Sequence, residues 1–245
     1  MPHKKIAIVT GASTGLGLSL SLKLLQEGYL VHGISCTQTH WKTAQKSVNF
    51  SSDFRLHQFD VTDENEVKLF FEGIKKTGEN IHLLINNAGY ASVPIKFENI
   101  TTEEFKKNID VNLYGTFLMC KYALPIMQNN KQGTIINISS MAGKRAVPEL
   151  SIYSASKFGV LALSQALAKE NIQNGIKCYT VCPGGMHTEM RAKLFGSEDA
   201  LRQQTTDYVA GVIMQTISGE INIDSGGDIV IRHSKISAIN PVPLA

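Results

Sequence analysis

The chain has 245 residues, of which 43% are hydrophobic and 18% are charged, and its 24 basic and 21 acidic residues give a formal net charge of +3. This near balance argues against the basic surface that nucleic acids and anionic membranes attract. No apolar run has the length of a membrane span or of a signal-peptide core, so we expect a cytoplasmic protein without a membrane partner.

The four cysteines (Cys36, Cys120, Cys178 and Cys182) show no CxxC spacing and no regular framework, which is typical of reduced thiols. The seven histidines are scattered and show no paired ligand spacing. We therefore expect no metal site.

Short apolar runs alternate with helical patterns along the chain. Strands are predicted at 5–10, 29–35, 54–61, 81–88, 133–139 and 176–184, and helices at 18–28, 64–78, 102–128 and 153–173. Another helix lies somewhere in 200–219. The last strand is expected at 228–233, although 219–224 is an alternative, and 233–245 should form a loosely held tail.

The predicted strands are rich in β-branched residues, as strands buried on both faces are. Strand and helix alternate throughout, which indicates a parallel sheet with right-handed crossovers. We expect an α/β protein: a single doubly wound, Rossmann-type domain over 1–245, with about seven parallel strands and helices on both faces of the sheet.

A glycine-rich segment, TGASTGLG, follows the first strand and leads into the first helix. Its glycines, Gly11, Gly15 and Gly17, permit a tight turn and let a pyrophosphate approach the helix N-terminus. The spacing is GxxxGxG. In the first strand–helix turn of a parallel sheet, this segment indicates a dinucleotide site.

A second segment, YSASK, places Tyr153 and Lys157 four residues apart at the start of a predicted helix. The two side chains therefore share one helix face. Taken alone, the pair allows two interpretations: Tyr153 packs while Lys157 is solvated, or the ammonium of Lys157 acts on the phenol.

The chain resembles the short-chain dehydrogenase/reductase family, in the branch of about this length. The resemblance covers roughly 5–190 and rests on seven motifs in order: TGASTGLG (10–17), FDV (59–61), NNAG (86–89), VNLYGT (111–116), NISS (137–140), YSASK (153–157) and PGGMHT (183–188).

The resemblance implies a catalytic set of Asn112, Ser140, Tyr153 and Lys157. Lys157 is expected to lower the pKa of Tyr153, which then serves as the general acid/base. Ser140 would hold the substrate oxygen, and Asn112 would position a water for proton relay. Ser139, which precedes the family's serine, is expected simply to end its strand.

The resemblance also implies the cofactor contacts. The glycine segment would bind the dinucleotide, Asp60 would meet the adenine, NNAG would steady the sheet beside the cofactor, and PGGMHT would hold the nicotinamide end. The expected contact residues are Gly11, Ser13, Thr14, Gly15, Leu16, Gly17, Ser35, Asp60, Val61, Asn87, Ala88, Gly89, Tyr153, Lys157, Pro183, Gly184 and Thr188.

The choice between the two nicotinamide cofactors depends on the end of the second strand. Residues 32–42 contain no Asp or Glu, and Ser35 stands where NAD-selective folds place an acid. An acid there would repel a 2′-phosphate, so we favour NADP(H), with NAD(H) possible. Ser35, Thr37 and Lys42 are the available partners.

The implied function is hydride transfer between a nicotinamide and a small carbonyl or secondary alcohol substrate, as in a carbonyl reductase. A non-catalytic dinucleotide sensor and a non-redox relative are the alternatives. Lys144 and Arg145 are either partners of an anionic substrate or merely solvated. The helices at 102–128 and 153–173 are expected to pair with a second copy in a homodimer or homotetramer.

Overall fold

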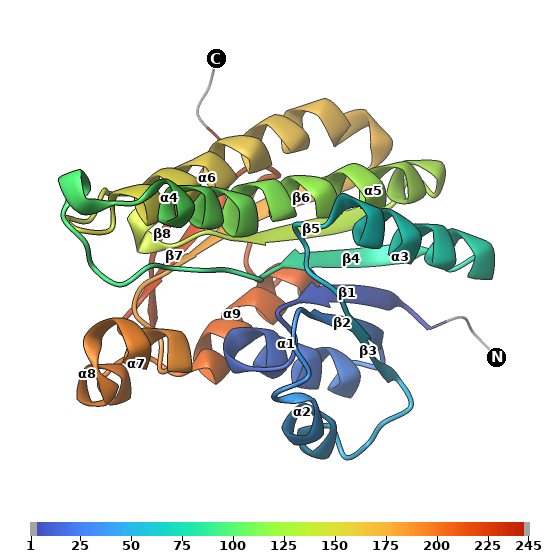
Figure 1. The fold of residues 1–245 in the computed structure, drawn as a ribbon. Helices are drawn as coiled ribbons and strands as arrows, with labels where there is room; N and C mark the ends of the chain where they lie inside the picture. The colour runs from blue at the N-terminus through green and yellow to red at the C-terminus, as the bar shows by residue number, and fades with distance from the viewer. Residues whose placement is uncertain (1–3, 243–245) are drawn as a thin grey trace.

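The computed structural model describes residues 4–242, which form one α/β domain around an eight-stranded sheet (Figure 1). The strand order is β3-β2-β1-β4-β5-β6-β7-β8. Strands β1 to β7 are parallel, and β8 runs antiparallel to β7. The strands are β1 (Ile6–Thr10), β2 (Leu30–Ser35), β3 (Phe54–Gln58), β4 (Ile81–Asn86), β5 (Gly133–Ile138), β6 (Ile176–Pro183), β7 (Asp228–Arg232) and β8 (Lys235–Asn240).

Helices cover both faces of the sheet (Figure 1). One apolar layer joins the sheet to α1, α2 and α9, and the other joins it to α3, α5 and α6. The helices are α1 (Gly15–Gln26), α2 (Trp41–Ser47), α3 (Glu64–Thr77), α4 (Thr102–Ile109), α5 (Gly115–Asn129), α6 (Ser151–Asn171), α7 (Glu189–Phe195), α8 (Ser197–Leu201) and α9 (Thr206–Ser218). Within residues 4–242, no helix combines the length and the apolar character that crossing a membrane requires.

Side-chain caps mark the starts of several helices, α3 and α4 among them. The Asp63 carboxylate accepts hydrogen bonds from the backbone N–H groups of Asn65 and Glu66, and the Thr101 hydroxyl accepts one from that of Glu104. Each cap satisfies N–H groups that have no partner within the helix.

The region predicted as one helix at 102–128 is divided. A π-helical segment, η2 (Asp110–Tyr114), separates α4 from α5 and contains Asn112. Such segments insert an extra residue into a helical turn and often occur at functional sites. Apolar periodicity continues across the insertion, so the sequence pattern does not show it.

The prediction of a loosely held tail was wrong for most of 233–245. Residues 235–240 form β8, which extends the expected seven strands to eight, while residues 243–245 lie outside the described part. The β7–β8 turn consists of His233 and Ser234, with φ values of 51° and 52°. A two-residue turn of this kind usually contains Asn or Gly, so the usual hairpin signal is missing.

Candidate active site

The predicted site residues lie at the carboxyl edge of the sheet. Strand order reverses between β1 and β4, because β2 and β3 lie on one side of β1 while β4, β5 and β6 follow on the other. In open α/β sheets, ligands bind outside the carboxyl ends of the strands at such a reversal. The loops that follow β1, β4, β5 and β6 therefore surround one site.

The backbone of the glycine segment, residues 11–17, makes a tight turn that leaves the first N–H groups of α1 accessible to a ligand. Gly11 has a φ of +66°, and a Cβ on Gly17 would overlap the carbonyl oxygen of Gly11. Among the described residues, the Thr14 side chain makes no capping hydrogen bond, so it does not occupy the backbone N–H groups at the start of α1. These groups and the positive end of the helix dipole form an anion cradle.

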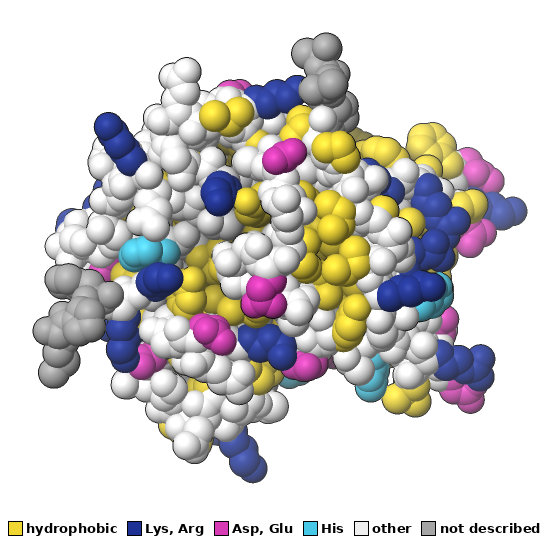
Figure 2. Space-filling view, turned by 180° about the vertical axis from the view of Figure 1, so that it is seen from behind, with side chains coloured by type: hydrophobic (Ala, Val, Ile, Leu, Met, Phe, Trp, Pro, Cys, Tyr) yellow, Lys and Arg dark blue, Asp and Glu magenta, His cyan; other side chains and the backbone are white. Residues whose placement is uncertain are grey.

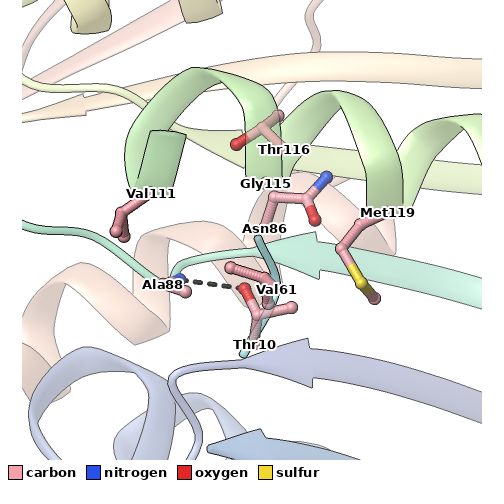
Figure 3. A pocket seen from close by; sticks show the side chains of 8 residues that line it. All are labelled: Thr10, Val61, Asn86, Ala88, Val111, Gly115, Thr116 and Met119. Carbon is pink, nitrogen blue, oxygen red and sulfur yellow. Dashed lines mark hydrogen bonds between the residues drawn. The ribbon is translucent and has the colours of Figure 1, made fainter. Parts of the chain in front are cut away.

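Thr10, the last residue of β1, fastens this segment to the end of β4. Its hydroxyl accepts hydrogen bonds from the backbone N–H groups of Asn87 and Ala88, both at 2.9 Å, and the second is drawn in Figure 3. The Asn87 side chain donates to the carbonyl oxygen of Thr10 at 2.9 Å. These hydrogen bonds hold the NNAG segment against the end of β1, in line with the role that the resemblance implies. Their partner, Thr10, was missed by the sequence analysis.

A narrow crevice lies beside this junction (Figure 3), with Val61 and Ala88 next to Thr10 and the wall of η2 and α5 opposite. Eight residues line it: Thr10, Val61, Asn86, Ala88, Val111, Gly115, Thr116 and Met119. A Cβ on Gly115 would approach Val61 Cγ2 to 2.7 Å, so glycine is required for α5 to pack this closely.

Asn112 is fully buried and holds the loop after β4. Its side-chain amide donates to the carbonyl oxygen of Tyr90 at 2.8 Å, and its Oδ1 accepts from the Tyr90 N–H at 2.9 Å. A second amide hydrogen bond reaches Ser156 Oγ at 3.0 Å. The π-helical turn thus places the Asn112 side chain between the backbone of Tyr90 and Ser156 on α6.

Lys157 lies deep in the site. Its Nζ donates to the carbonyl oxygen of Ile138 at 2.9 Å, and a Cβ on Gly89 would come within 3.7 Å of Nζ and 3.3 Å of Asn112 Oδ1. Burial lowers the pKa of Lys157 to about 8. Gly89, Asn112 and Lys157 are therefore immediate neighbours.

Tyr153 stands over Lys157, whose Nζ lies 5.8 Å from the centroid of the phenol ring. Burial raises the pKa of Tyr153, and a hydrogen bond with the Ser140 side chain opposes this in part. The expected lowering of the Tyr153 pKa by Lys157 is not what this structure shows. The reason is that Lys157 directs its ammonium to Ile138, and desolvation dominates at the phenol.

The two neighbouring serines have different environments. Ser139 is buried, and its hydroxyl donates to the carbonyl oxygen of Lys157 at 2.8 Å. Ser140 is half-buried and accepts a hydrogen bond from the Ala142 N–H at 3.1 Å. Only Ser140 is therefore placed to meet both Tyr153 and a ligand.

The end of β2 carries a short hydroxyl chain. Ser35 Oγ donates to the carbonyl oxygen of Thr37 at 2.9 Å and lies 3.0 Å from Ser13 Oγ. Because Ser35 has one hydroxyl proton, Ser13 must be the donor between the two serines. Asp60 is exposed, and its carboxylate accepts from the backbone N–H and the hydroxyl of Thr62, each at 2.9 Å.

The PGGMHT segment closes over the glycine segment. A Cβ on Gly15 would lie 3.5 Å from Thr188 Cγ2, so the two loops face each other closely. Thr188 also caps α7, since its hydroxyl accepts from the Arg191 N–H at 3.2 Å. The segment begins at the end of β6, whose last residue is Pro183, and Gly184 follows directly.

Lys144 is not available for an anionic substrate. Its ammonium lies 2.9 Å from the carboxylate of Asp228, which is buried, and that carboxylate also accepts from the Asn240 amide at 2.9 Å. Neither Asp228 nor Asn240 is near Lys144 in sequence. Neither alternative, a partner of an anionic substrate or a merely solvated side chain, describes Lys144, whereas Arg145 is exposed.

The family model described as short chain dehydrogenase matches residues 5–199. The chain belongs to the short-chain dehydrogenase/reductase family. An NADPH-dependent pterin aldehyde reductase from Arabidopsis thaliana is 28% identical over 230 residues, which cover 93% of each chain. Carbonyl reductase family member 4 from Xenopus laevis is 34% identical, over 81% of this chain and 82% of the relative. The solved structure of ElxO with NADP bound is 31% identical, with a TM-score of 0.83 over 94% of this chain and 97% of that one.

Membership in this family confirms the predicted resemblance and fold and makes the protein an oxidoreductase by family. The family binds nicotinamide dinucleotides, and the residues present fit such a group. The turn that presents the backbone N–H groups at the start of α1 has no room for a Cβ at Gly17, which would overlap the Gly11 carbonyl oxygen, and buried Lys157 lies near Gly89 in the loop after β4. Sequence reasoning missed four residues that hold this site: Tyr90 and Ile138 act through backbone atoms, and Thr10 and Ser156 act through hydroxyls whose partners are distant in sequence.

Proposed function

We propose that the protein is an NADP(H)-preferring reductase of a small carbonyl compound. The observation that carries the proposal is the convergence of Asn112, Ser140, Tyr153 and Lys157 beside the glycine cradle. A cradle alone would serve a sensor. A phenol that lies near a buried ammonium and is hydrogen-bonded to a serine is an arrangement suited to proton transfer.

The cofactor supplies the hydride. Ser140 holds the substrate oxygen through its hydroxyl, and Tyr153 donates the proton that this oxygen takes up. The raised pKa of Tyr153 suits this direction, because a general acid must carry its proton before the reaction. The phenolate that remains lies beside the ammonium of Lys157, whose Nζ is 5.8 Å from the ring centroid.

Reprotonation of Tyr153 has a route through Lys157. The ammonium donates to Ile138 O, and the Asn112 side chain lies beside it on the wall formed by Tyr90 and Ser156. With its pKa lowered to about 8, Lys157 exchanges protons readily near neutral pH. Asn112 would position the water that connects Lys157 to solvent.

The preference for NADP(H) rests on the end of β2. Ser35 is uncharged, and its hydroxyl proton is directed to Thr37, so the position repels no 2′-phosphate. We propose Thr37 and Lys42 as the phosphate's neighbours. The NADPH dependence of the Arabidopsis relative and the NADP bound to ElxO support this choice.

Fluorescence titration with NADPH and NADH, followed by turnover assays with small aldehydes, tests the proposal. We expect tighter binding of NADPH. In Tyr153→Phe, NADPH affinity should stay within about twofold, while turnover should fall at least about 100-fold, because general acid catalysis contributes 10²–10⁴-fold. Tyr29→Phe, on the loop before β2, is the matched control and should leave both unchanged.

An unchanged rate in Tyr153→Phe would exclude the proposed mechanism. Binding of NADPH by the wild type without turnover of any aldehyde would favour the sensor alternative. Preference for NADH would leave the catalytic proposal in place and overturn the cofactor choice.

A further inference from the structure

The β7–β8 hairpin carries a basic hollow that the proposed reaction does not use. The hollow measures about 410 Å³ and is lined by Arg232, His233, Lys235, Ile236 and Ser237. Arg232 and Lys235 are directly opposite each other across the antiparallel pair. Their side chains therefore project from the same face of the hairpin.

Like charges directly opposite each other destabilise a strand pair. Elsewhere near the site, cations have acidic partners: Lys144 has Asp228, and Arg191 has Asp199. Within residues 4–242, neither Arg232 nor Lys235 forms an ion pair. The hairpin thus concentrates positive charge that no acid of the described chain offsets.

The two-residue turn between Arg232 and Lys235 has a strained backbone and is held in place by hydrogen bonds with Gln204. His233 and Ser234 both have positive φ, which costs free energy in residues other than glycine and is common at functional sites. The buried Gln204 fixes the turn: its amide donates to the Ile231 carbonyl at 3.1 Å, and its Oε1 accepts from the Ser234 N–H at 3.1 Å.

The hollow adjoins the predicted nicotinamide end of the site. Arg232 ends β7, at the same carboxyl edge as the other parallel strands, and its Cγ would lie 3.3 Å from a Cβ on Gly184. Gln204 also joins the hairpin to the PGGMHT segment, because its carbonyl accepts from the His187 N–H at 2.9 Å. A substrate at the nicotinamide therefore has this hollow as a neighbour.

We propose that Arg232 and Lys235 bind an anionic group of the substrate, a carboxylate or a phosphate, and so make the enzyme selective for acidic carbonyl compounds. This inference rests on the proposed reductase function. A guanidinium and an ammonium are the donors that form strong, charge-assisted hydrogen bonds with such groups.

Three aldehydes that share one ring test the inference: 4-carboxybenzaldehyde, 4-formylphenyl phosphate and the neutral methyl 4-formylbenzoate. Each is assayed with NADPH and the wild type, and with Arg232→Gln/Lys235→Gln, which removes both charges and keeps the side chains long. Lys75→Gln/Lys177→Gln removes two exposed charges, on α3 and at the start of β6, and is the matched control. Circular dichroism checks folding of every variant.

For the wild type we expect kcat/KM for at least one anionic aldehyde to exceed that for the ester by about tenfold, mainly through KM, in line with charged hydrogen bonds. The hairpin variant should lose this preference and keep its rate on the ester, whereas the control variant should keep both. The better of the two anions identifies the group that the hollow takes.

Direct binding is measured independently by following the backbone amide signals of Ser234 and Lys235 in NMR titrations with terephthalate and with inorganic phosphate. Shifts that disappear in the hairpin variant support the inference. Equal rates for ester and anions together with unshifted amides overturn it and leave the reductase proposal intact. Turnover of none of the three aldehydes counts against the reductase proposal, and the titrations then decide the anion site alone.

Discussion

At the scale of single residues, adjacent side chains of one type have different tasks. Ser139 and Ser140 follow β5 directly and are adjacent in sequence, yet their hydroxyls have different partners. Ser139 is buried and hydrogen-bonded to the backbone of α6, while Ser140 meets Tyr153. The spacing in the family's motif led to the choice of Ser140, which remains a prediction that the two substitutions below test.

This difference predicts different phenotypes for two alanine substitutions. Ser139→Ala should lower the free energy of unfolding by about 1 kcal/mol and leave kcat nearly unchanged, because only a buried hydrogen bond to the Lys157 carbonyl is lost. Ser140→Ala loses the hydrogen bond from the Ala142 N–H, which also costs about 1 kcal/mol, but its main effect should be a fall in kcat on the order of 100-fold, as loss of one donor to a reacting oxygen produces. Chemical denaturation and steady-state kinetics measure the two effects. A stable, active Ser140→Ala would remove Ser140 from the mechanism.

At the scale of elements, β2 and β3 hold a histidine pair away from the active site. His32 Nδ1 lies 2.9 Å from His57 Nε2, the rings stack, and Glu79 and Arg55 flank them. Burial is the main cause that lowers the pKa of each histidine to about 4, with Arg55 contributing to both. Both rings are therefore neutral at pH 7 in the folded protein.

The pair predicts sensitivity to acid. Unfolded histidine has a pKa of about 6.5, so between pH 6.5 and 4 the unfolded chain binds more protons than the folded one. The free energy of unfolding should accordingly fall as pH drops through this window, by on the order of 2 kcal/mol. Denaturation curves at pH 7 and pH 4.5 measure the loss. The His57→Phe variant keeps a ring beside Phe70, and its free energy of unfolding should fall less between pH 7 and pH 4.5 than that of the wild type. An equal fall in the two proteins would show that the histidine pair is not the cause of the acid sensitivity.

The elements also show how far the sequence could be read. Apolar runs located β1 to β7 because strands buried on both faces are continuous and β-branched. The short helix α2 was missed, since only Ala44 is buried and little periodicity results. The strand β8 was missed because its turn is His233-Ser234, and Lys144 was misinterpreted because its partner, Asp228, is 84 positions away. A motif identifies residues that are close in sequence, whereas a contact such as Lys144–Asp228 joins residues that only the folded chain brings together.

At the scale of the whole molecule, the surface is mixed in charge. Figure 2 shows Lys and Arg side chains interspersed with Asp and Glu around a central apolar area, with no large field of one sign. On α4, η2, α5 and α6, exposed aromatic side chains gather: Phe105, Tyr114, Phe117 and Phe158. Aromatic side chains are enriched at protein interfaces, so we propose that these helices form the interface of a homodimer or homotetramer.

Phe117→Glu tests this assembly. The glutamate would stand four residues before Lys121 on α5, where it could join the ion pair that Lys121 forms with Glu64, so the helix should persist while the apolar surface is lost. Light scattering after size-exclusion chromatography should show a lower molar mass than for the wild type. Leu69→Glu, at an exposed apolar residue on α3, is the control and should not change the mass. An equal mass for all three proteins would place the interface elsewhere or exclude it.

The bond between Lys144 and Asp228 has a consequence for synthesis of the protein. Ser140 and its loop leave the ribosome early, but the carboxylate and amide that seat this loop belong to Asp228 and Asn240. At a synthesis rate of about 5–20 residues per second, the loop waits several seconds for these partners. The loop that carries Ser140 and Lys144 therefore cannot be fastened in place until Asp228 and Asn240 have been synthesised. A chain truncated before Asp228 would contain all seven motifs and still lack the partner of Lys144.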